Sequence, residues 1–206
     1  MNVITISREF GSGGRELGKR MADVLCWDYY DREIIETVAN EEGLDADYVQ
    51  AVLERHEWWT VPISFHRSFT ATTTPNVELL VKEKEVIERI AASGRSCVIV
   101  GRNADYFLRD YKPFRIFVCA DLASKIQRCR ERASNPETLT DKEIQRQIKR
   151  IDRNRAAVRE LMSGDPWGCR SCYHLTVNTT DWEMKRLAPV TAEFAMGFFE
   201  RETHNP

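Results

Sequence analysis

The chain has 206 residues, of which 42% are hydrophobic and 30% are charged, a composition typical of one globular domain. Its formal net charge of −2 provides no overall basic field, so neither nucleic acid nor a membrane surface is expected as a partner. No apolar run approaches the ~18 residues of a membrane-spanning helix, and the start of the chain lacks a signal-peptide pattern, so a cytoplasmic protein is expected.

The first half of the chain opens with an apolar strand at Val3–Ile6, a glycine-rich turn and a helix at Glu16–Leu25. A second short strand is expected at Tyr29–Tyr30, just before Asp31. The residues after it predict a helix at 33–40, a helix from 45 to about 56, an aromatic-rich segment over 58–75 and a helix at 76–93. The aromatic segment is interpreted either as a site-forming insertion or as a loop packed by its own side chains.

The second half contains the strongest strand, Cys97–Val100, and a further strand at Phe114–Cys119. A helix capped by Asp121 follows, and a capping box of Thr140 with Glu143 then opens a long helix that ends near residue 162. The last elements are a strand at 174–178 and a helix at 182–200. The apolar side of that helix is expected to carry Leu187, Val190, Phe194 and Phe198.

Five short strands that alternate with helices predict an α/β fold with a parallel sheet and helices on both faces. Ligands of such sheets bind beyond the carboxyl ends of the strands. The functional loops are therefore expected at 8–16, at 31, at 101–105 and after 120.

The six cysteines indicate no metal site. Only Cys169 and Cys172 are spaced as ligands, in a single Cys-x-x-Cys motif. One such motif supplies two thiolates, whereas structural zinc takes four ligands. Reduced thiols are the simplest interpretation, and the sequence gives this motif no role.

The glycine-rich turn after the first strand is typical of a phosphate-binding loop, with altered chemistry. When the phosphate-loop pattern is aligned on Gly13, Arg8 replaces its first glycine, Gly14 its lysine and Arg15 its Ser/Thr. The two arginines can supply the missing positive charge as planar, bidentate groups. The alternative is a turn for tight strand–helix packing with both arginines solvated. A dinucleotide-binding pattern fails because it requires glycine at Glu16.

A second basic feature lies on the long helix. Its residues Arg146, Lys149, Arg150 and Arg153 share one face, and only Asp152 offsets the positive charge between 146 and 155. Such a stripe suggests a polyanion such as nucleotide phosphates, although most charged helix faces are simply solvated.

These motifs, in this order, resemble the cytidylate kinase-like family, within the nucleoside-monophosphate kinase branch of the P-loop NTPases. The resemblance rests on 3–18, Tyr29-Tyr-Asp31, Val98-Ile-Val-Gly-Arg102, Asp152-Arg-Asn-Arg-Ala156, Trp167-Gly168 and 173–179. It implies a three-layer αβα P-loop fold in one domain, with a core of residues 1–31, 94–133 and 167–206. A nucleoside-monophosphate-binding insertion would span about 32–93, and a helical lid about 134–166.

The resemblance, with the charges noted above, also implies site residues. The donor phosphates of ATP would contact Arg8, Gly11, Ser12, Gly13, Gly14, Arg15 and Glu16. The acceptor would contact Asp31, Arg102, Asn103, Asp105, Asp152 and Arg155. Catalytic charge would come from Arg15, Arg150, Arg153 and Arg155. Mg²⁺ would be held by phosphates and water, with Ser12 or Glu16 as possible ligands and no protein ligand assigned.

The function expected from the sequence is ATP-dependent phosphoryl transfer to a nucleoside monophosphate, with a CMP- or dCMP-like acceptor favoured. Asn103 stands where established cytidylate kinases have aspartate, and the residues near Trp58 match no base-recognition pattern. Two alternatives stay open: a nucleotide- or anion-binding regulator on the same fold that transfers nothing, and a kinase of another small metabolite. The sequence leaves the oligomeric state open.

Overall fold

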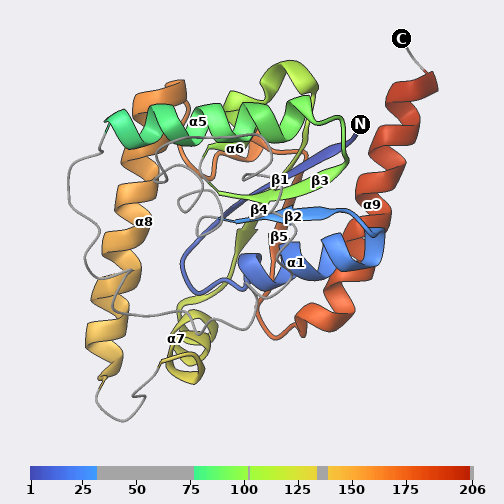
Figure 1. The fold of residues 1–206 in the computed structure, drawn as a ribbon. Coiled ribbons are helices and arrows are strands. Elements are labelled where there is room, and N and C mark those ends of the chain that lie inside the picture. The colour runs from blue at the N-terminus through green and yellow to red at the C-terminus, as the bar shows by residue number, and fades with distance from the viewer. Residues whose placement is uncertain (32–76, 102, 134–138, 205–206) are drawn as a thin grey trace.

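The computed structural model describes residues 1–31, 77–101, 103–133 and 139–204. Within these ranges the chain forms the predicted five-stranded parallel sheet with helices on both faces (Figure 1). The helices expected at 33–40 and 45–56, the aromatic segment and Arg102 lie outside the described residues.

The strands are β1 (Val3–Arg8), β2 (Asp28–Tyr30), β3 (Cys97–Val100), β4 (Phe114–Cys119) and β5 (Leu175–Asn178). They stand in the order β2-β3-β1-β4-β5, and each neighbouring pair is parallel. In the central strand β1, Ile4 lies beside Val98 of β3 and Phe114 of β4. The carboxyl ends of all five strands therefore point to the same edge of the sheet.

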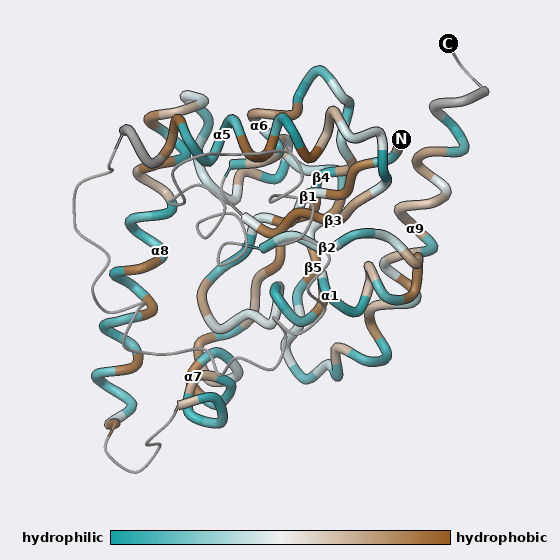
Figure 2. Tube along the Cα trace, viewed as in Figure 1, coloured by the Kyte–Doolittle hydropathy of each residue, from teal (hydrophilic) through white to brown (hydrophobic). Residues whose placement is uncertain are grey.

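Alternate strand residues face opposite layers of helices. On one face, α1 (Gly14–Leu25) and α9 (Met184–His204) pack over Ile4 and Ile6. On the other face, α5 (Val77–Ala92) and the short α6 (Ala104–Phe107) pack over Val3 and Ile99. Figure 2 shows the apolar strands between helices whose outer sides are largely hydrophilic. Among the described residues, none of the helices combines the length and the apolar character needed to cross a membrane.

Two further helices lie near the carboxyl end of the sheet (Figure 1). Helix α7 (Leu122–Glu131) begins at the predicted cap, where the Asp121 carboxylate accepts a hydrogen bond from the Ser124 N–H at 2.7 Å. Helix α8 (Asp141–Ser163) opens with the predicted capping box and ends at Gly164, in the left-handed region. Its Ile144 and Ile148 pack with α7 in a small separate cluster. Single 3₁₀ turns at Arg109–Tyr111 and Arg170–Cys172 precede β4 and β5.

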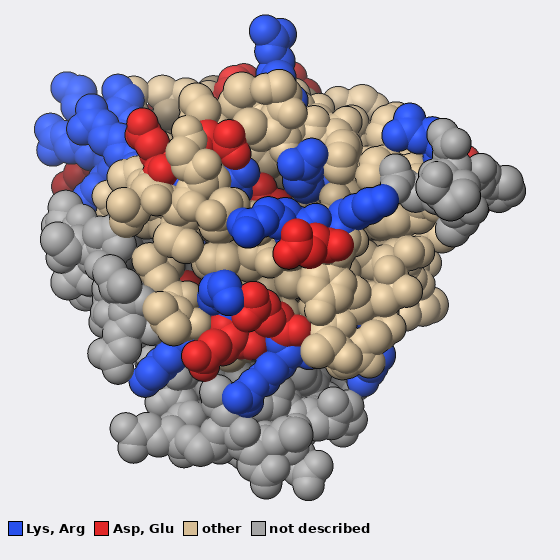
Figure 3. Space-filling view, turned by 90° about the horizontal axis from the view of Figure 1, so that it is seen from above, with Lys and Arg blue, Asp and Glu red and all other residues tan. Residues whose placement is uncertain are grey.

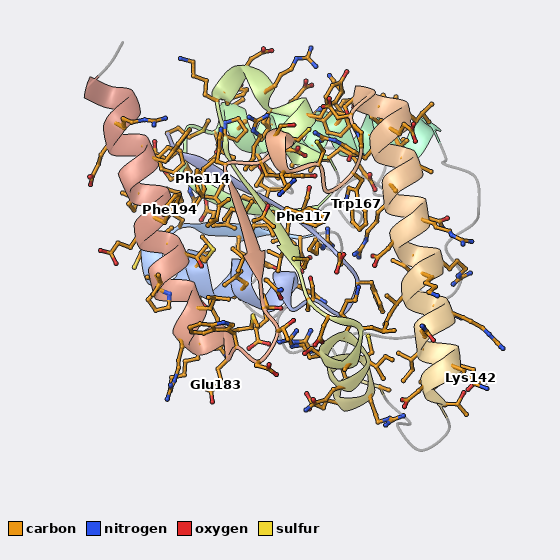
Figure 4. The ribbon with its side chains drawn as sticks, turned by 180° about the vertical axis from the view of Figure 1, so that it is seen from behind. Phe114, Phe117, Lys142, Trp167, Glu183 and Phe194 are labelled. Atoms are coloured by element: carbon orange, nitrogen blue, oxygen red, sulfur yellow. The ribbon has the colours of Figure 1, made fainter. Side chains whose placement is uncertain are left out.

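The predicted apolar side of the last helix is wrong in part. Val190 and Phe194 are 65% and 56% exposed, although the Phe194 ring still lies 5.9 Å from that of Phe114 (Figure 4). The buried side of α9 carries Met184, Ala188, Ala192, Ala195 and Phe199. Three of these residues are alanines, whose small side chains let α9 approach α1 and the sheet closely. The larger apolar residues dominate a sequence pattern, and so the pattern indicated the neighbouring face.

Candidate functional site

The glycine-rich turn joins β1 to α1 at the carboxyl edge of the sheet. The Glu9 N–H donates to the Val118 carbonyl of β4 at 2.9 Å. The Glu9 carbonyl then accepts from the hydroxyl of Ser12 at 2.8 Å and from its N–H at 3.4 Å. Gly11 and Gly13 have φ values of 78° and 82°, which other residues adopt only with strain. The turn is therefore held by its own backbone and by β4.

The start of α1 presents backbone N–H donors at this turn. Within the described residues, no hydrogen bond is formed by the N–H groups of Gly13, Gly14 or Glu16. These groups belong to the first turn of a helix, where N–H groups have no partner within the helix and the helix dipole is positive. The arrangement fits an anion such as a phosphate group.

The two departures from the phosphate-loop pattern at positions 8 and 14 contact each other. A Cβ atom on Gly14 would come within 2.7 Å of the Cβ of Arg8, so glycine is required there. The Arg8 side chain then runs towards β3, where its Nη1 occupies the space of a Cβ on Gly101. The cation that replaces the first loop glycine thus lies at the end of β3.

Arg15 points to the end of β2. Its Nε lies 2.6 Å from the carboxylate of Asp31, which is 2% exposed. The Tyr29 hydroxyl donates to the same carboxylate at 3.2 Å. Burial raises the pKa of Tyr29 above its usual range, so the phenol remains a donor at neutral pH. The structure therefore brings together two predicted site residues, Arg15 and Asp31.

Glu16, the next residue, points to the opposite side of the turn. Its carboxylate accepts from Arg20 at 2.9 Å and from Arg132, just after α7, at 2.7 Å. Nearby, Arg128 of α7 donates to the Thr179 carbonyl at 2.6 Å, and the Thr179 hydroxyl donates to the Ser12 carbonyl at 2.6 Å. This side of the turn receives its positive charge from α7.

A buried lysine of α7 also contacts the turn. Lys125, which is 9% exposed, lies with its Nζ 2.9 Å from the Glu9 carboxylate. The Lys125 carbonyl would lie 2.9 Å from a Cβ on Gly11, so α7 packs directly on the turn. Lys125, Arg128 and Arg132 were missed by sequence reasoning. They are more than 100 residues from the turn, and no local spacing connects them to it.

Helix α8 meets the turn through main-chain groups. The Phe10 N–H donates to the Asp152 carboxylate at 2.7 Å, and Arg155 Nη1 donates to the Arg8 carbonyl at 2.8 Å. The Arg155 guanidinium also lies 5.7 Å from the centre of the Phe10 ring. Burial raises the pKa of Asp152, while Arg155 and the Phe10 N–H oppose that shift. Two of the predicted residues of α8 thus fix the position of the turn.

The comparison with known families identifies the chain. A model described as the cytidylate kinase-like family matches residues 3–181. The chain belongs to this family. A search of curated proteins returned no match.

Solved structures show the same fold at low sequence identity. An uncharacterized protein from Eubacterium ventriosum is 20% identical, with 95% of this chain and 98% of that chain covered and a TM-score of 0.70. A shikimate kinase from Bacteroides thetaiotaomicron is 13% identical, with 94% and 97% covered and a TM-score of 0.52. The similarity establishes a P-loop kinase fold for this member of the cytidylate kinase-like family.

The remaining predicted site residues differ from one another in exposure. Asn103 begins α6 in the left-handed region, with a φ of 52°. Arg150 of α8 is partly buried, whereas Arg153 is exposed, as are Arg146 and Lys149 of the same stripe. Seen from the α5–α6 side, Lys and Arg gather at one edge of the molecule, on the side where α8 lies (Figure 3).

Asp105 is buried in the core and does not take the substrate-contacting position predicted for it. It is 4% exposed and forms an ion pair with Arg159 of α8 at 2.7 Å. Burial raises the pKa of Asp105, and the Arg159 charge opposes this shift. Sequence reasoning placed Asp105 at the acceptor because it follows β3. The structure turns it into the core as the partner of a buried arginine.

No metal-binding cluster is present in the part of the chain that the structure describes. The Ser12 hydroxyl donates to Glu9, and the Glu16 carboxylate is paired with two arginines. The two side chains considered as Mg²⁺ ligands are therefore both engaged. The donor set of this turn, backbone N–H groups and arginines, fits a phosphate group.

Proposed function

We propose that this protein transfers a phosphoryl group from ATP to a nucleoside monophosphate, with a CMP- or dCMP-like acceptor favoured. The observation that supports this proposal is the glycine-rich turn, whose backbone N–H groups fit a phosphate and whose two sides are contacted by arginines. Membership of the cytidylate kinase-like family supports the same activity.

The two sides of the turn would hold different substrates. The donor phosphates would lie on the N–H groups of Gly13, Gly14 and Glu16, with Arg132 beside them. The acceptor would lie at the ends of β2 and β3, where Arg15 pairs with Asp31. Positive charge between the two substrates would stabilise the transferring phosphoryl group without any covalent role for the protein.

Lys125 is the candidate for part of the role that the loop lysine has in other P-loop proteins. Its ammonium group is buried against the turn and is held by Glu9. Bound Mg²⁺ would supply charge neutralisation of the donor phosphates. The protein's own contribution would be to bind and orient the phosphates through the turn, Arg15 and Arg132.

A second candidate is a nucleotide-binding regulator that transfers nothing. The specific observation in its favour is that Ser12 and Glu16 are both engaged within the protein. A kinase of another small metabolite is a third possibility, because a shikimate kinase shares the fold. The three functions predict different results for whether any acceptor is turned over and for which acceptor is preferred.

An ADP-release assay over CMP, dCMP, UMP, AMP and shikimate, paired with calorimetric ATP binding, separates the three functions. We expect turnover to be highest with CMP or dCMP. Turnover with shikimate alone would favour the metabolite kinase. ATP binding without turnover of any acceptor would favour the regulator.

Arg15→Ala tests the role of the turn. We expect kcat/KM to fall about 10³-fold, as when an arginine that stabilises the transferring phosphoryl group is lost. Arg95→Ala is the matched control, because Arg95 pairs with Asp28 at an exposed position outside the site. Unchanged binding and turnover in Arg15→Ala would contradict the proposal.

A further inference from the structure

The Cys-x-x-Cys motif forms a compact turn at the surface. Cys169 and Cys172 bracket the 3₁₀ turn Arg170–Cys172, and the Cys172 N–H donates to the Cys169 carbonyl at 3.0 Å. A turn closed by such a hydrogen bond brings its end residues within about 7 Å between Cα atoms. Disulfides span Cα distances of about 4.4–6.8 Å. The two thiols are free and partly exposed, so the turn has the geometry to close.

The two thiols differ in their surroundings. The Cys169 sulfur lies 3.1 Å from the Ser171 hydroxyl. Hydrogen bonds from Ser171, and then from Cys172, hold the pKa of the Cys169 thiol below its usual range. Burial and the nearby Asp165 carboxylate raise the pKa of Cys172. Cys169 is thus favoured as the attacking thiolate, and Cys172 as the thiol that resolves the intermediate.

The other cysteines lack this combination. Burial raises the pKa of Cys97 to about 12 and that of Cys129 to about 11. Burial also raises the pKa of Cys119. Cys26 is exposed at the end of α1, where its sulfur donates to the Asp23 carbonyl. Within the described ranges, no group of three or more His, Cys, Asp or Glu side chains is arranged to hold a metal ion.

The turn lies where α8 joins β5. Trp167, two residues before Cys169, packs edge-on against Phe117 of β4, with 5.3 Å between the ring centres (Figure 4). Tyr173 packs on the same Phe117 ring at 5.1 Å. The charge of Arg159 on α8 lowers the pKa of Cys172, against the larger effect of burial. Arg159 also lies 3.6 Å from the Asp165 carboxylate. A change of oxidation state at this turn would therefore change the surroundings of Arg159 near the end of α8.

We propose that Cys169 and Cys172 form a dithiol site that exchanges with small-molecule disulfides and closes to an intramolecular disulfide. This role is independent of the phosphoryl transfer proposed above and requires no nucleotide.

The exchange balances with a small-molecule disulfide as the oxidant. The Cys169 thiolate attacks one sulfur of the disulfide, a mixed disulfide forms, and the first small thiolate leaves and takes a proton from water. Cys172 then loses its proton to water, and its thiolate attacks the Cys169 sulfur. The Cys169–Cys172 bond forms as the second small thiolate leaves and is protonated. Two protein thiols are oxidised, and one disulfide is reduced to two thiols.

The test treats the reduced full-length protein with excess oxidised glutathione and follows intact mass and peptide maps. We expect loss of two hydrogen atoms and a Cys169–Cys172 crosslink. Cys172→Ser should instead accumulate one glutathione on Cys169. Cys169→Ser is the matched control and should be modified about tenfold more slowly at Cys172, because less of that thiol is ionised.

A measurement on the unmutated protein removes any dependence on variant folding. Under limiting iodoacetamide near neutral pH, we expect Cys169 to be alkylated about tenfold faster than Cys172. A crosslink at other cysteines, modification of Cys26 without a Cys169–Cys172 bond, or stoichiometric zinc released from the purified protein by thiol modification would each overturn the proposal.

Discussion

Two of the contacts that helix α8 makes with the rest of the molecule have opposite character. Near its end, Arg159 pairs with Asp105, and the two side chains are 4% and 2% exposed. In its middle, Arg155 and Asp152 contact main-chain groups of the glycine-rich turn, with side chains 25% and 16% exposed. The first contact isolates two charges from water, and the second bonds to the turn at a partly wet site. We infer that the end of α8 serves stability and that its middle serves the turn.

The largest expected effect is on stability at the end of the helix. Arg159→Met would leave the Asp105 carboxylate buried without its partner and should lower the free energy of unfolding by about 3–5 kcal/mol at neutral pH. Urea denaturation measures this loss.

The loss should depend on pH in a defined direction. Burial already raises the pKa of Asp105, and removing Arg159 takes away the charge that opposes this shift. When the pKa of a carboxyl group is higher in the folded than in the unfolded state, the protein becomes less stable as pH rises from about 4, the unfolded pKa, through the folded pKa. The deficit of Arg159→Met should therefore be smaller at low pH. Adding Asp105→Asn should remove this dependence, and a deficit equal at all pH values would contradict the account.

The second effect is on activity at the middle of the helix. Arg155→Ala removes the hydrogen bond to the Arg8 carbonyl and should reduce kcat/KM about 10²-fold through misplacement of the turn. The unfolding free energy should fall by only about 1 kcal/mol, the usual value of one hydrogen bond. A loss of stability as large as that of Arg159→Met would erase the distinction between the two contacts.

Asp152→Asn tests whether the charge or the hydrogen bond matters in the middle of α8. The amide oxygen can still accept from Phe10, so stability should change by no more than about 1 kcal/mol. Because burial raises the pKa of Asp152, the unmutated protein loses stability as pH rises from about 4 through the folded value of this group. The variant lacks this loss, so its stability relative to the unmutated protein should increase over that range. Denaturation across pH checks the sign.

The smallest effect is expected at Arg153. This side chain is exposed on the outer face of α8. Arg153→Ala should change kcat/KM by less than about fivefold and leave stability within ~0.5 kcal/mol. A reduction matching that of Arg155→Ala would show that the outer face of α8 reaches the substrates during turnover.

Local patterns predicted most of the fold. The β-branched run of Cys97–Val100 and the capping box of Thr140 with Glu143 appear where their chemistry requires them. The expected start of α1 at Glu16 was two residues late, because the glycines that begin the helix resemble a turn. The buried face of α9 was misplaced because alanines, which permit the closest packing, carry a weak hydropathy signal.

The candidate site was less predictable from the sequence than the fold. The parallel-sheet pattern placed the loops of Arg15 and Asp31 at one edge, but it did not predict that the two side chains pair. Local spacing gave no sign of Lys125 or Arg132. Asp105 was expected at the acceptor because it follows a strand, and its burial depends on Arg159, 54 positions further along the chain. The roles proposed for the site residues remain predictions until activity is measured.

The contact between Arg8 and Gly14 determines how this loop can change over evolutionary time. In the usual pattern, glycine stands at the position of Arg8 and lysine at the position of Gly14. In this chain the large residue is at position 8 and the glycine at position 14. Gly14→Lys alone would force a Cβ to within 2.7 Å of Arg8, so it should misfold the turn. Arg8→Gly would remove this clash, and the common loop would then need both Gly14→Lys and a Ser or Thr in place of Arg15. Gly14 can therefore gain a side chain only after Arg8 has been replaced by a smaller residue, so the order of these two changes is constrained.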